Sequence, residues 1–97
     1  MRLKKALKIL SSQRDELRTT YNVDSLSVFG SVARDEASEE SDIDILVDFS
    51  ETPGIFGFLQ LKTYLEKILS TPVDLVTKNA IKKQMSEAIL RDSIHAA

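Results

Sequence analysis

The chain has 97 residues, of which 42% are hydrophobic and 29% charged, with no cysteine and a formal net charge of -2. We therefore expect one small domain spanning residues 1–97, and we exclude disulfide frameworks, thiolate metal sites and cysteine nucleophiles. No apolar run approaches the roughly 20 residues of a membrane span. The basic N-terminus lacks the apolar core of a signal peptide, so we expect a cytoplasmic protein with no membrane contact. Because the chain is acidic overall, we expect no direct nucleic-acid binding.

Residues 2–20 are expected to form an amphipathic helix. Six basic side chains fall within residues 1–20, mostly off the apolar stripe. A basic helix can touch nucleic acid or an acidic partner, but a solvated face is the commoner use of such a pattern. The stripe at helical spacing comprises Leu3, Leu7, Leu10, Leu17 and Tyr21.

A short strand is expected over residues 26–30, leaving through a tight turn at Gly30. Ser31 is expected to cap a short helix in residues 32–37, and the "SEES" stretch is typical of a polar loop. The next strand, residues 42–49, alternates with period two. Its apolar face carries Ile43, Ile45, Val47 and Phe49, and its other face carries Asp42, Asp44, Leu46 and Asp48.

After a turn at residues 50–54, apolar spacing predicts a helix over 58–69, a strand over 73–76 and a last helix over 81–89. His95, the single histidine, is expected in a frayed tail. Helices and strands thus alternate along the chain. The order predicts an α/β or α+β domain with helices packed on one small sheet.

The acidic stretch is the strongest functional signal. Eight carboxylates and no Lys or Arg lie between residues 35 and 51. Asp42 and Asp44 project from the same side of their strand, roughly 7 Å apart, where they repel unless a cation lies between them. Oxygen ligands suit Mg²⁺ or Mn²⁺. Asp48 lies roughly 13 Å beyond Asp44, too far to share the ion.

Asp74 is the third candidate ligand, because a carboxylate inside an apolar strand is costly unless it is paired or metal-bound. If its strand neighbours residues 42–49, it can reach the same ion. Three carboxylates that hold two divalent ions suit in-line attack on a nucleoside triphosphate. The exposed amides and hydroxyl of Gly30 and Ser31 suit phosphate oxygens.

Other uses of an Asp-x-Asp pair fit less well. A calcium EF-hand loop needs further oxygen ligands where this chain has Leu46 and Val47. Phosphatase and glycosyltransferase pairs usually end an apolar strand, whereas this pair begins one. A solvated acidic loop is the remaining alternative. The Gly-Ser turn upstream and Asp74 downstream favour metal binding or catalysis.

The run "GSVARDEASEESDIDILVDF", with "PVDLVT" downstream, resembles the DNA polymerase β-type nucleotidyltransferases and is similar to their minimal nucleotidyltransferase (MNT) members. The resemblance implies a small mixed β-sheet flanked by helices. It also implies catalytic and Mg²⁺-binding roles (two ions, with Mn²⁺ possible) for Asp42, Asp44 and Asp74, and triphosphate binding at Gly30 and Ser31. Arg34 matches an arginine that helps hold phosphate or structure. Asp35 departs from the pattern, since many relatives have glycine there.

MNT proteins are commonly antitoxins paired with a HEPN-domain RNase toxin. The resemblance therefore implies a type VII-like antitoxin, a protein adenylyltransferase that moves AMP from ATP to a tyrosine hydroxyl of its toxin. Two other hypotheses stay open: a non-catalytic module that neutralises its partner by occlusion, and transfer to a small molecule such as an aminoglycoside. The second needs a pocket that this length hardly provides.

Overall fold

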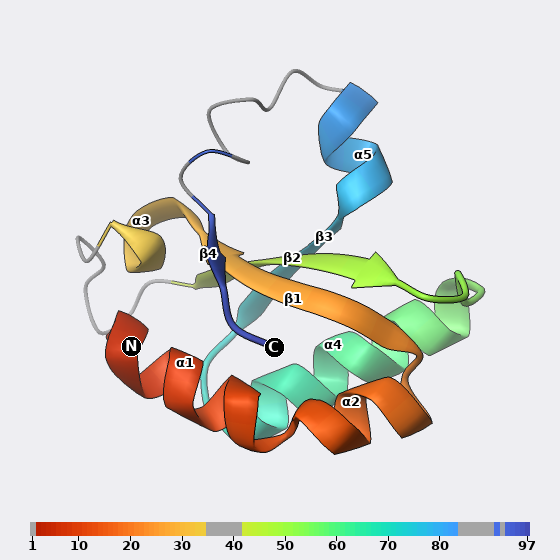
Figure 1. The fold of residues 1–97 in the computed structure, drawn as a ribbon, viewed down its shortest axis with the longest axis horizontal. Coiled ribbons are helices and arrows are strands. Elements are labelled where there is room, and N and C mark those ends of the chain that lie inside the picture. The colour runs from red at the N-terminus through yellow and green to blue at the C-terminus, as the bar shows by residue number, and fades with distance from the viewer. Residues whose placement is uncertain (1, 35–41, 84–90, 92) are drawn as a thin grey trace.

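The computed structural model describes residues 2–34, 42–83, 91 and 93–97 (Figure 1). These residues form helices and strands in a nearly alternating order. In chain order they are α1 (Leu3–Ser12), α2 (Arg14–Thr20), β1 (Val23–Phe29), α3 (Gly30–Ala33), β2 (Ile43–Phe49), α4 (Ile55–Leu69), β3 (Val73–Thr77), α5 (Lys78–Lys83) and β4 (Ile94–His95). None of the helices in these described ranges is long and apolar enough to cross a membrane.

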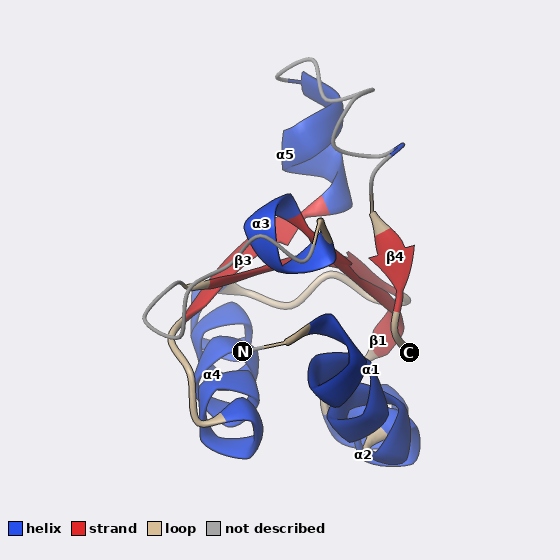
Figure 2. Ribbon diagram, turned by 90° about the vertical axis from the view of Figure 1, so that its left-hand side faces the viewer, coloured by secondary structure: helices blue, strands red, loops and turns tan. Residues whose placement is uncertain are grey.

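The four strands make one mixed sheet in the order β3-β2-β1-β4. β2 and β3 run parallel, whereas β1 is antiparallel to both β2 and β4. Helices α1, α2 and α4 cover one face of this sheet, while α3 and α5 lie on its other side (Figures 1 and 2). The small mixed sheet flanked by helices that the sequence predicted is confirmed.

The main core lies between the sheet and the layer of α1, α2 and α4. Alternate residues of β2 enter it, and Ile43, Ile45 and Val47 are fully buried, as the period-two pattern predicted. Leu61 and Leu65 of α4 meet them from below. The opposite face of the sheet therefore receives the other half of each strand's side chains.

The helix expected over residues 2–20 is in fact two helices. The chain leaves helical geometry at Gln13, where φ is -105° and ψ is 15°. The hydroxyls of Ser11 and Ser12 donate to the carbonyls of Lys8 and Ile9, at 3.1 and 2.6 Å. Serine side chains that bond the backbone in this way compete with helix continuation, which explains the break.

The other boundaries shift by a few residues. β1 begins at Val23 because Asn22 turns the corner before it with a left-handed φ of 55°. α4 begins at Ile55 and α5 at Lys78, each three residues before the expected start. The remainder of the helix expected over 81–89, beyond residue 83, lies outside the described residues.

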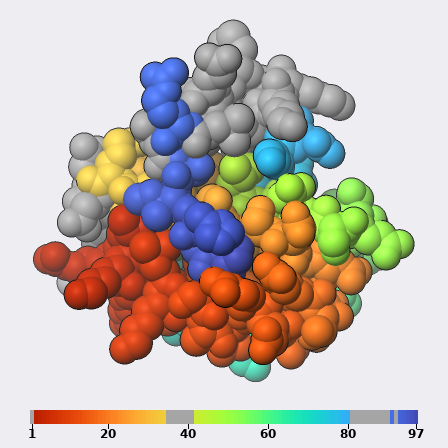
Figure 3. Space-filling view, in the orientation of Figure 1, coloured from red at the N-terminus to blue at the C-terminus, as the bar shows by residue number. Residues whose placement is uncertain are grey.

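The expectation of a frayed tail at His95 was wrong. Residues Ile94 and His95 form β4, which pairs with Val28 and Ser27 of β1. Beyond it, Ala96 and Ala97 are buried and exchange hydrogen bonds of 2.8 to 3.2 Å with the backbone of Leu26. Figure 3 shows this segment lying over β1 and α1. The outer edge of β1 offers unpaired backbone groups, and the tail satisfies them.

Candidate active site

Two aspartates face each other across the parallel strands β2 and β3. Asp44 is the register partner of Asp74, so the two residues share one row and one face of the sheet. Their carboxyl groups are in hydrogen-bond contact. Neighbouring strands are only about 4.8 Å apart, which makes this contact a direct result of the pairing. The strand around residue 74 thus neighbours residues 42–49, as the site hypothesis required.

The pKa of Asp44 is raised above its ordinary value. Burial of the half-exposed side chain is the largest cause, followed by the charge of Asp74 and the hydrogen bond to it, and then by the charge of Asp42. The positive charge of Arg34 acts in the opposite direction. Two carboxylates in contact cannot both stay ionised unless a cation lies between them; otherwise one of them takes up a proton. The pair is therefore a receptor for positive charge.

Gly30, the residue after the end of β1, lies against Asp44 of this pair. Its φ of +71° lies in the left-handed region, which favours glycine. A Cβ atom built on it would overlap Oδ2 of Asp44. The glycine follows Phe29, which is the register partner of Asp44, so the end of β1 delivers it to the carboxylate. No larger residue fits without displacing Asp44.

Ser31 and Arg34 lie in and just after the short helix that follows. Ser31 is half-buried in α3 and does not cap it, because the helix begins at Gly30 with Phe29 in the capping position. The capping prediction was therefore wrong; the left-handed glycine starts the helical turn one residue early. Arg34 ends α3, and its exposed side chain is close enough to Asp44 to lower the pKa of that carboxyl. Residues 35–41, which include Asp35, lie outside the described residues.

Asp42 is exposed, lies just before β2, and its charge reaches Asp44. Among the residues that the structure describes, no three acidic or histidine side chains converge into a complete metal cage. Asp44 and Asp74 form the preassembled part, and Asp42 stands beside it. An all-oxygen donor set with excess negative charge fits a hard divalent cation such as Mg²⁺ or Mn²⁺.

Two neighbours of the acidic pair were not singled out from the sequence. Phe29 and Leu46 are buried on the same face as Asp44, with Val76 packed against them. This apolar cluster lies next to the acids, since Phe29 is the register partner of Asp44 and Leu46 follows it on the same face. The sequence does contain a sign of this cluster. Leu46 and Val76 follow Asp44 and Asp74 by two residues, so each lies on the same face of its strand as the acid.

Asp48 lies one step further along the same face and belongs to a different contact. Its carboxylate is 3.8 Å from the ammonium group of Lys78, at the start of α5. Lys78 follows Asp74 and Val76 at a spacing of two residues, just beyond the end of β3. This spacing could have identified it as a residue of the same face. The structure thus places Asp48 with a cation of the protein and away from the Asp44–Asp74 pair.

Comparison with known proteins identifies the family to which this chain belongs. The model of the nucleotidyltransferase domain family matches residues 10–95. The protein adenylyltransferase MntA of Thermococcus cleftensis is 44% identical over 87 residues, which cover 90% of this chain and 88% of the relative. A solved structure provisionally named a minimal nucleotidyltransferase is 35% identical, with a TM-score of 0.78 and coverage of 97% and 95% of the two chains.

A third comparison extends the likeness of fold. A complex of a tri-AMPylated HEPN toxin from Shewanella oneidensis with an MNT antitoxin contains a chain that is 18% identical, with a TM-score of 0.65 and coverage of 94% of this chain and 71% of that chain. At this identity the match concerns the fold alone. Together with the family match and the paired aspartates beside a Gly-Ser turn, the comparisons show that the chain belongs to the nucleotidyltransferase domain family, as one of its minimal members.

Proposed function

We propose that this chain is a Mg²⁺-dependent protein adenylyltransferase that acts as the antitoxin of a HEPN-domain RNase toxin. In this proposal it transfers AMP from ATP to a tyrosine hydroxyl of the toxin and so silences it. The relative from Thermococcus cleftensis, which is named as a protein adenylyltransferase, supports the reaction class. The antitoxin complex of the same fold supports the kind of partner.

The contact between Asp44 and Asp74 is the observation that carries the proposal. Two acids from separate strands meet at one point, and Gly30 closes against one of them. Maintaining such a like-charged pair costs stability unless something positive binds there. A purely structural role would not explain why the chain keeps a destabilising pair, whereas metal-assisted nucleotidyl transfer requires acids that bind a cation.

Each residue of the site then has a stated task. Asp42, Asp44 and Asp74 would hold two Mg²⁺ ions, while the amides of Gly30 and Ser31 and the Ser31 hydroxyl would seat the triphosphate. When bound, the ions supply Lewis-acid chemistry that activates the hydroxyl and neutralises charge on the leaving pyrophosphate. Arg34 adds a positive charge on the same side of the sheet.

The acceptor enters from the β3 edge. Because β3 is an edge strand, Asp74 is the outermost acid of its row and is exposed. The hydroxyl oxygen of the acceptor forms a bond to the α-phosphorus of ATP while the bond between that phosphorus and the α–β bridging oxygen breaks. Pyrophosphate leaves, and the hydroxyl proton passes to a carboxylate oxygen of Asp74.

The proposal is tested by incubating the purified chain with ATP, Mg²⁺ and its cognate toxin, and measuring the intact mass of the toxin. We expect mass added in multiples of one AMP. The double variant Asp42→Ala plus Asp44→Ala should add none. Asp48→Ala is the matched control, since it removes a carboxylate from the same strand face outside the site, and it should still transfer AMP. Transfer that survives the double change would refute these roles.

A non-catalytic module that acts by occlusion is the alternative, and it makes a different prediction. The double variant would then still silence the toxin in cells at normal expression, while the toxin carries no AMP. The catalytic proposal expects toxicity to return with that variant. Transfer to a small molecule is the other alternative. In a screen of ATP consumption against small acceptors such as aminoglycosides, the catalytic proposal expects no turnover.

A further inference from the structure

The start of β3 is tied to α4 by a hydrogen bond that lies beside the acidic pair. The backbone N–H of Val73 donates to Oε2 of Glu66 at 2.9 Å. Val73 directly precedes Asp74, so this bond lies one residue from the outer acid of the pair. Glu66 is half-buried in the last turn of α4. The bond therefore joins the helical layer to the strand that carries Asp74.

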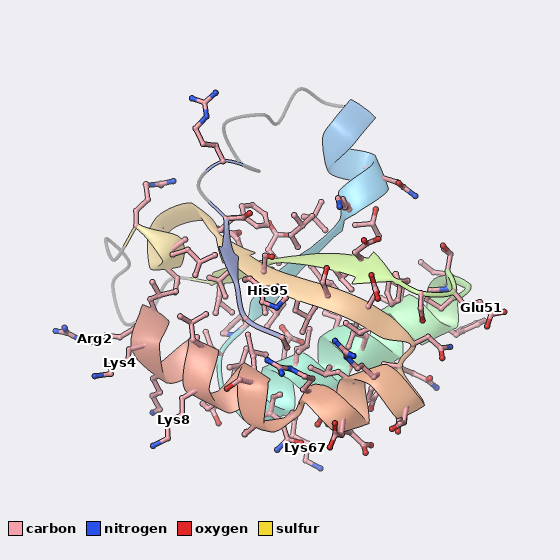
Figure 4. The ribbon with its side chains drawn as sticks, in the orientation of Figure 1. Arg2, Lys4, Lys8, Glu51, Lys67 and His95 are labelled. Carbon is pink, nitrogen blue, oxygen red and sulfur yellow. The ribbon has the colours of Figure 1, made fainter. Side chains whose placement is uncertain are left out.

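The charge of Glu66 is unfavourable at its place on the helix. The C-terminal end of a helix carries partial negative charge, which repels a carboxylate in the last turn. Lys67, the next residue, suits that end, and its exposed side chain lies on the outer side of the helical layer, away from the sheet (Figure 4). Glu66 turns to β3 instead, where the N–H of Val73 gives its carboxylate a donor that offsets the repulsion.

The outer side of β3 lacks the support that its inner side has. On the inner side, Ile43 of β2 donates its N–H to the carbonyl of Pro72 at 3.0 Å. Backbone groups of successive strand residues point to opposite sides, so the N–H of Val73 points outward. In the part of the chain that the structure describes, no strand pairs with β3 on that side. Glu66 supplies the acceptor that a neighbouring strand would otherwise provide.

The turn from α4 into β3 is held by local features (Figure 2). Ser70 ends the helix in the left-handed region, with a φ of 52°. The hydroxyl of Thr71 donates to the carbonyl of Leu69 at 3.1 Å, and the ring of Pro72 fixes φ just before the strand. These features set the path of the turn. The bond from Val73 then holds the first residue of the strand against the helix.

We propose that Glu66 is a positioning residue for the acidic pair, which acts through Val73 to set where Asp74 lies relative to Asp44. Asp44 belongs to β2, which is paired on both sides, whereas Asp74 belongs to the edge strand β3. A restraint at the start of β3 therefore acts on the more weakly held acid. The consequence for catalysis rests on the proposed function, since a shift of a reacting group by about 1 Å can lower a rate about a hundredfold.

A role in stability alone is the alternative, and it can be separated from positioning. Water can replace Glu66 as the acceptor for an N–H at an open strand edge, so loss of the carboxylate should cost the fold little. The same loss should free the start of β3 to move. Glu66 is thus expected to contribute more to the geometry of the site than to the stability of the chain.

Hydrogen exchange of the full chain without divalent ions tests the contact. In Glu66→Ala, the amides of Val73 and Ile43 should exchange at least about tenfold faster. Glu66→Gln keeps a carbonyl oxygen as acceptor, so both amides should stay protected. Leu26 is the internal reference, because its N–H donates to the carbonyl of Ala97 at the far edge of the sheet. Equal exchange of Val73 in all three chains would overturn the proposal.

Mn²⁺ binding tests the consequence at the acids. Groups that hold metal ligands in place typically contribute about 10- to 100-fold in metal affinity. Because Glu66 acts through the backbone, we expect Glu66→Ala to weaken Mn²⁺ binding by about tenfold, at the lower end of this range. Glu66→Gln removes the same charge but keeps the acceptor, and it should weaken binding by less than about twofold.

Glu16→Ala is the matched control for the loss of a glutamate side chain. Oε1 of Glu16 accepts a hydrogen bond of 3.0 Å from the hydroxyl of Thr20, within α2, so the bond does not reach the sheet. Its affinity for Mn²⁺ should equal that of the original chain. A fall as large as that in Glu66→Ala would show that any lost glutamate weakens binding, and the positioning role would be wrong.

AMP transfer to the cognate toxin separates this inference from the proposed function. Glu66→Ala should lower the rate of transfer about tenfold while its Tm falls by only about a few degrees, and Glu66→Gln should keep the rate. If the original chain adds no AMP, the proposed function fails, while the exchange and Mn²⁺ results still decide the role of Glu66. If the original chain adds AMP and Glu66→Ala binds Mn²⁺ as tightly as Glu66→Gln, the inference alone is wrong.

Discussion

The two faces of the sheet use the same strands for opposite purposes. Toward α1, α2 and α4, β2 presents Ile43, Ile45 and Val47, all fully buried in one apolar core. On the other face, the alternate residues Asp44 and Asp48 carry charge, with only a small apolar cluster between them. Because successive side chains of a strand alternate, the first set can secure the fold while the second holds a costly acidic pair.

This contrast predicts that changes on the core face of β2 reduce stability, whereas changes on its other face mainly affect activity. The largest effect on stability should come from the core face. Ile45→Ala removes a fully buried side chain and should cost about 3 kcal/mol, or a fall of more than about 10 °C in Tm. Leu46→Ala, its neighbour on the other face, should cost about half as much in a thermal melt, because its cluster is smaller. Equal losses at the two positions would contradict the division between the faces.

Gly30→Ala should damage the acidic face most severely among the changes that leave the core intact. The new Cβ is strained at a φ of +71° and overlaps the carboxylate of Asp44, so we expect a loss of about 1–3 kcal/mol and a fall in AMP transfer of about a hundredfold. Gly54→Ala is the control. Its Cβ meets nothing within 4 Å, and its rate of transfer should be unchanged.

Asp44→Asn should raise stability at neutral pH while abolishing transfer. The pKa of Asp44 is higher in the folded chain than in the unfolded one, so the folded state favours the protonated form. The stability that this carboxyl contributes is present at acid pH and is lost as the pH rises through the raised pKa. The variant avoids that loss, and we expect its Tm at pH 7 without divalent ions to rise by about 2–4 °C.

The original chain and the Asp44→Asn variant should have the same Tm at acid pH. Below the ordinary pKa of an aspartate, about 4, the original carboxyl is protonated in both states and the advantage of Asp44→Asn should disappear. Mg²⁺ at neutral pH should raise the Tm of the original chain more than that of the variant. A variant that melts at or below the original temperature at pH 7 would contradict the account of a strained acidic pair.

Lys78→Ala should have the smallest effect. Its ammonium group lies 3.8 Å from Asp48, with both side chains about two-fifths exposed (43% and 38%), and exposed pairs contribute little. We expect a change of less than about 0.5 kcal/mol in a denaturant titration. A loss beyond about 1 kcal/mol would show that this end of the open face contributes more to the fold than its exposure indicates.

Much of the fold, and the candidate residues of the site, could be predicted from local patterns. The period-two alternation of β2 identified its buried face. Spacing singled out Asp42 and Asp44, and the apolar strand around it singled out Asp74, before the contact between Asp44 and Asp74 was known. Spacing could not establish that contact, because it depends on which strands are neighbours. The break at Gln13 was also missed. It depends on the hydroxyls of Ser11 and Ser12, which bond to the backbone, whereas the apolar spacing continues through it.

The least predictable features arise from pairing across the chain. β4 is two residues long and has no periodic signal, and it forms because the edge of β1 needs partners. The tight turn expected at Gly30 is confirmed by its φ of +71°. The start of α3 at Gly30 was missed, because Ser31 was expected to cap the helix. The exposure of Phe56 could not be predicted either, because apolar spacing alone does not show which apolar residues the fold leaves on the surface.

The central claim is that Asp44 and Asp74, neighbours in space, form one divalent-cation site beside Gly30. Paramagnetic broadening of backbone amide signals by Mn²⁺ tests it most directly. We expect the signals of Gly30, Ser31, Asp44 and Asp74 to broaden first, those of α4 to stay sharp, and the effect to vanish in Asp44→Asn and Asp74→Asn. Broadening centred instead on Asp48 and Lys78, or unchanged in both variants, would contradict the account.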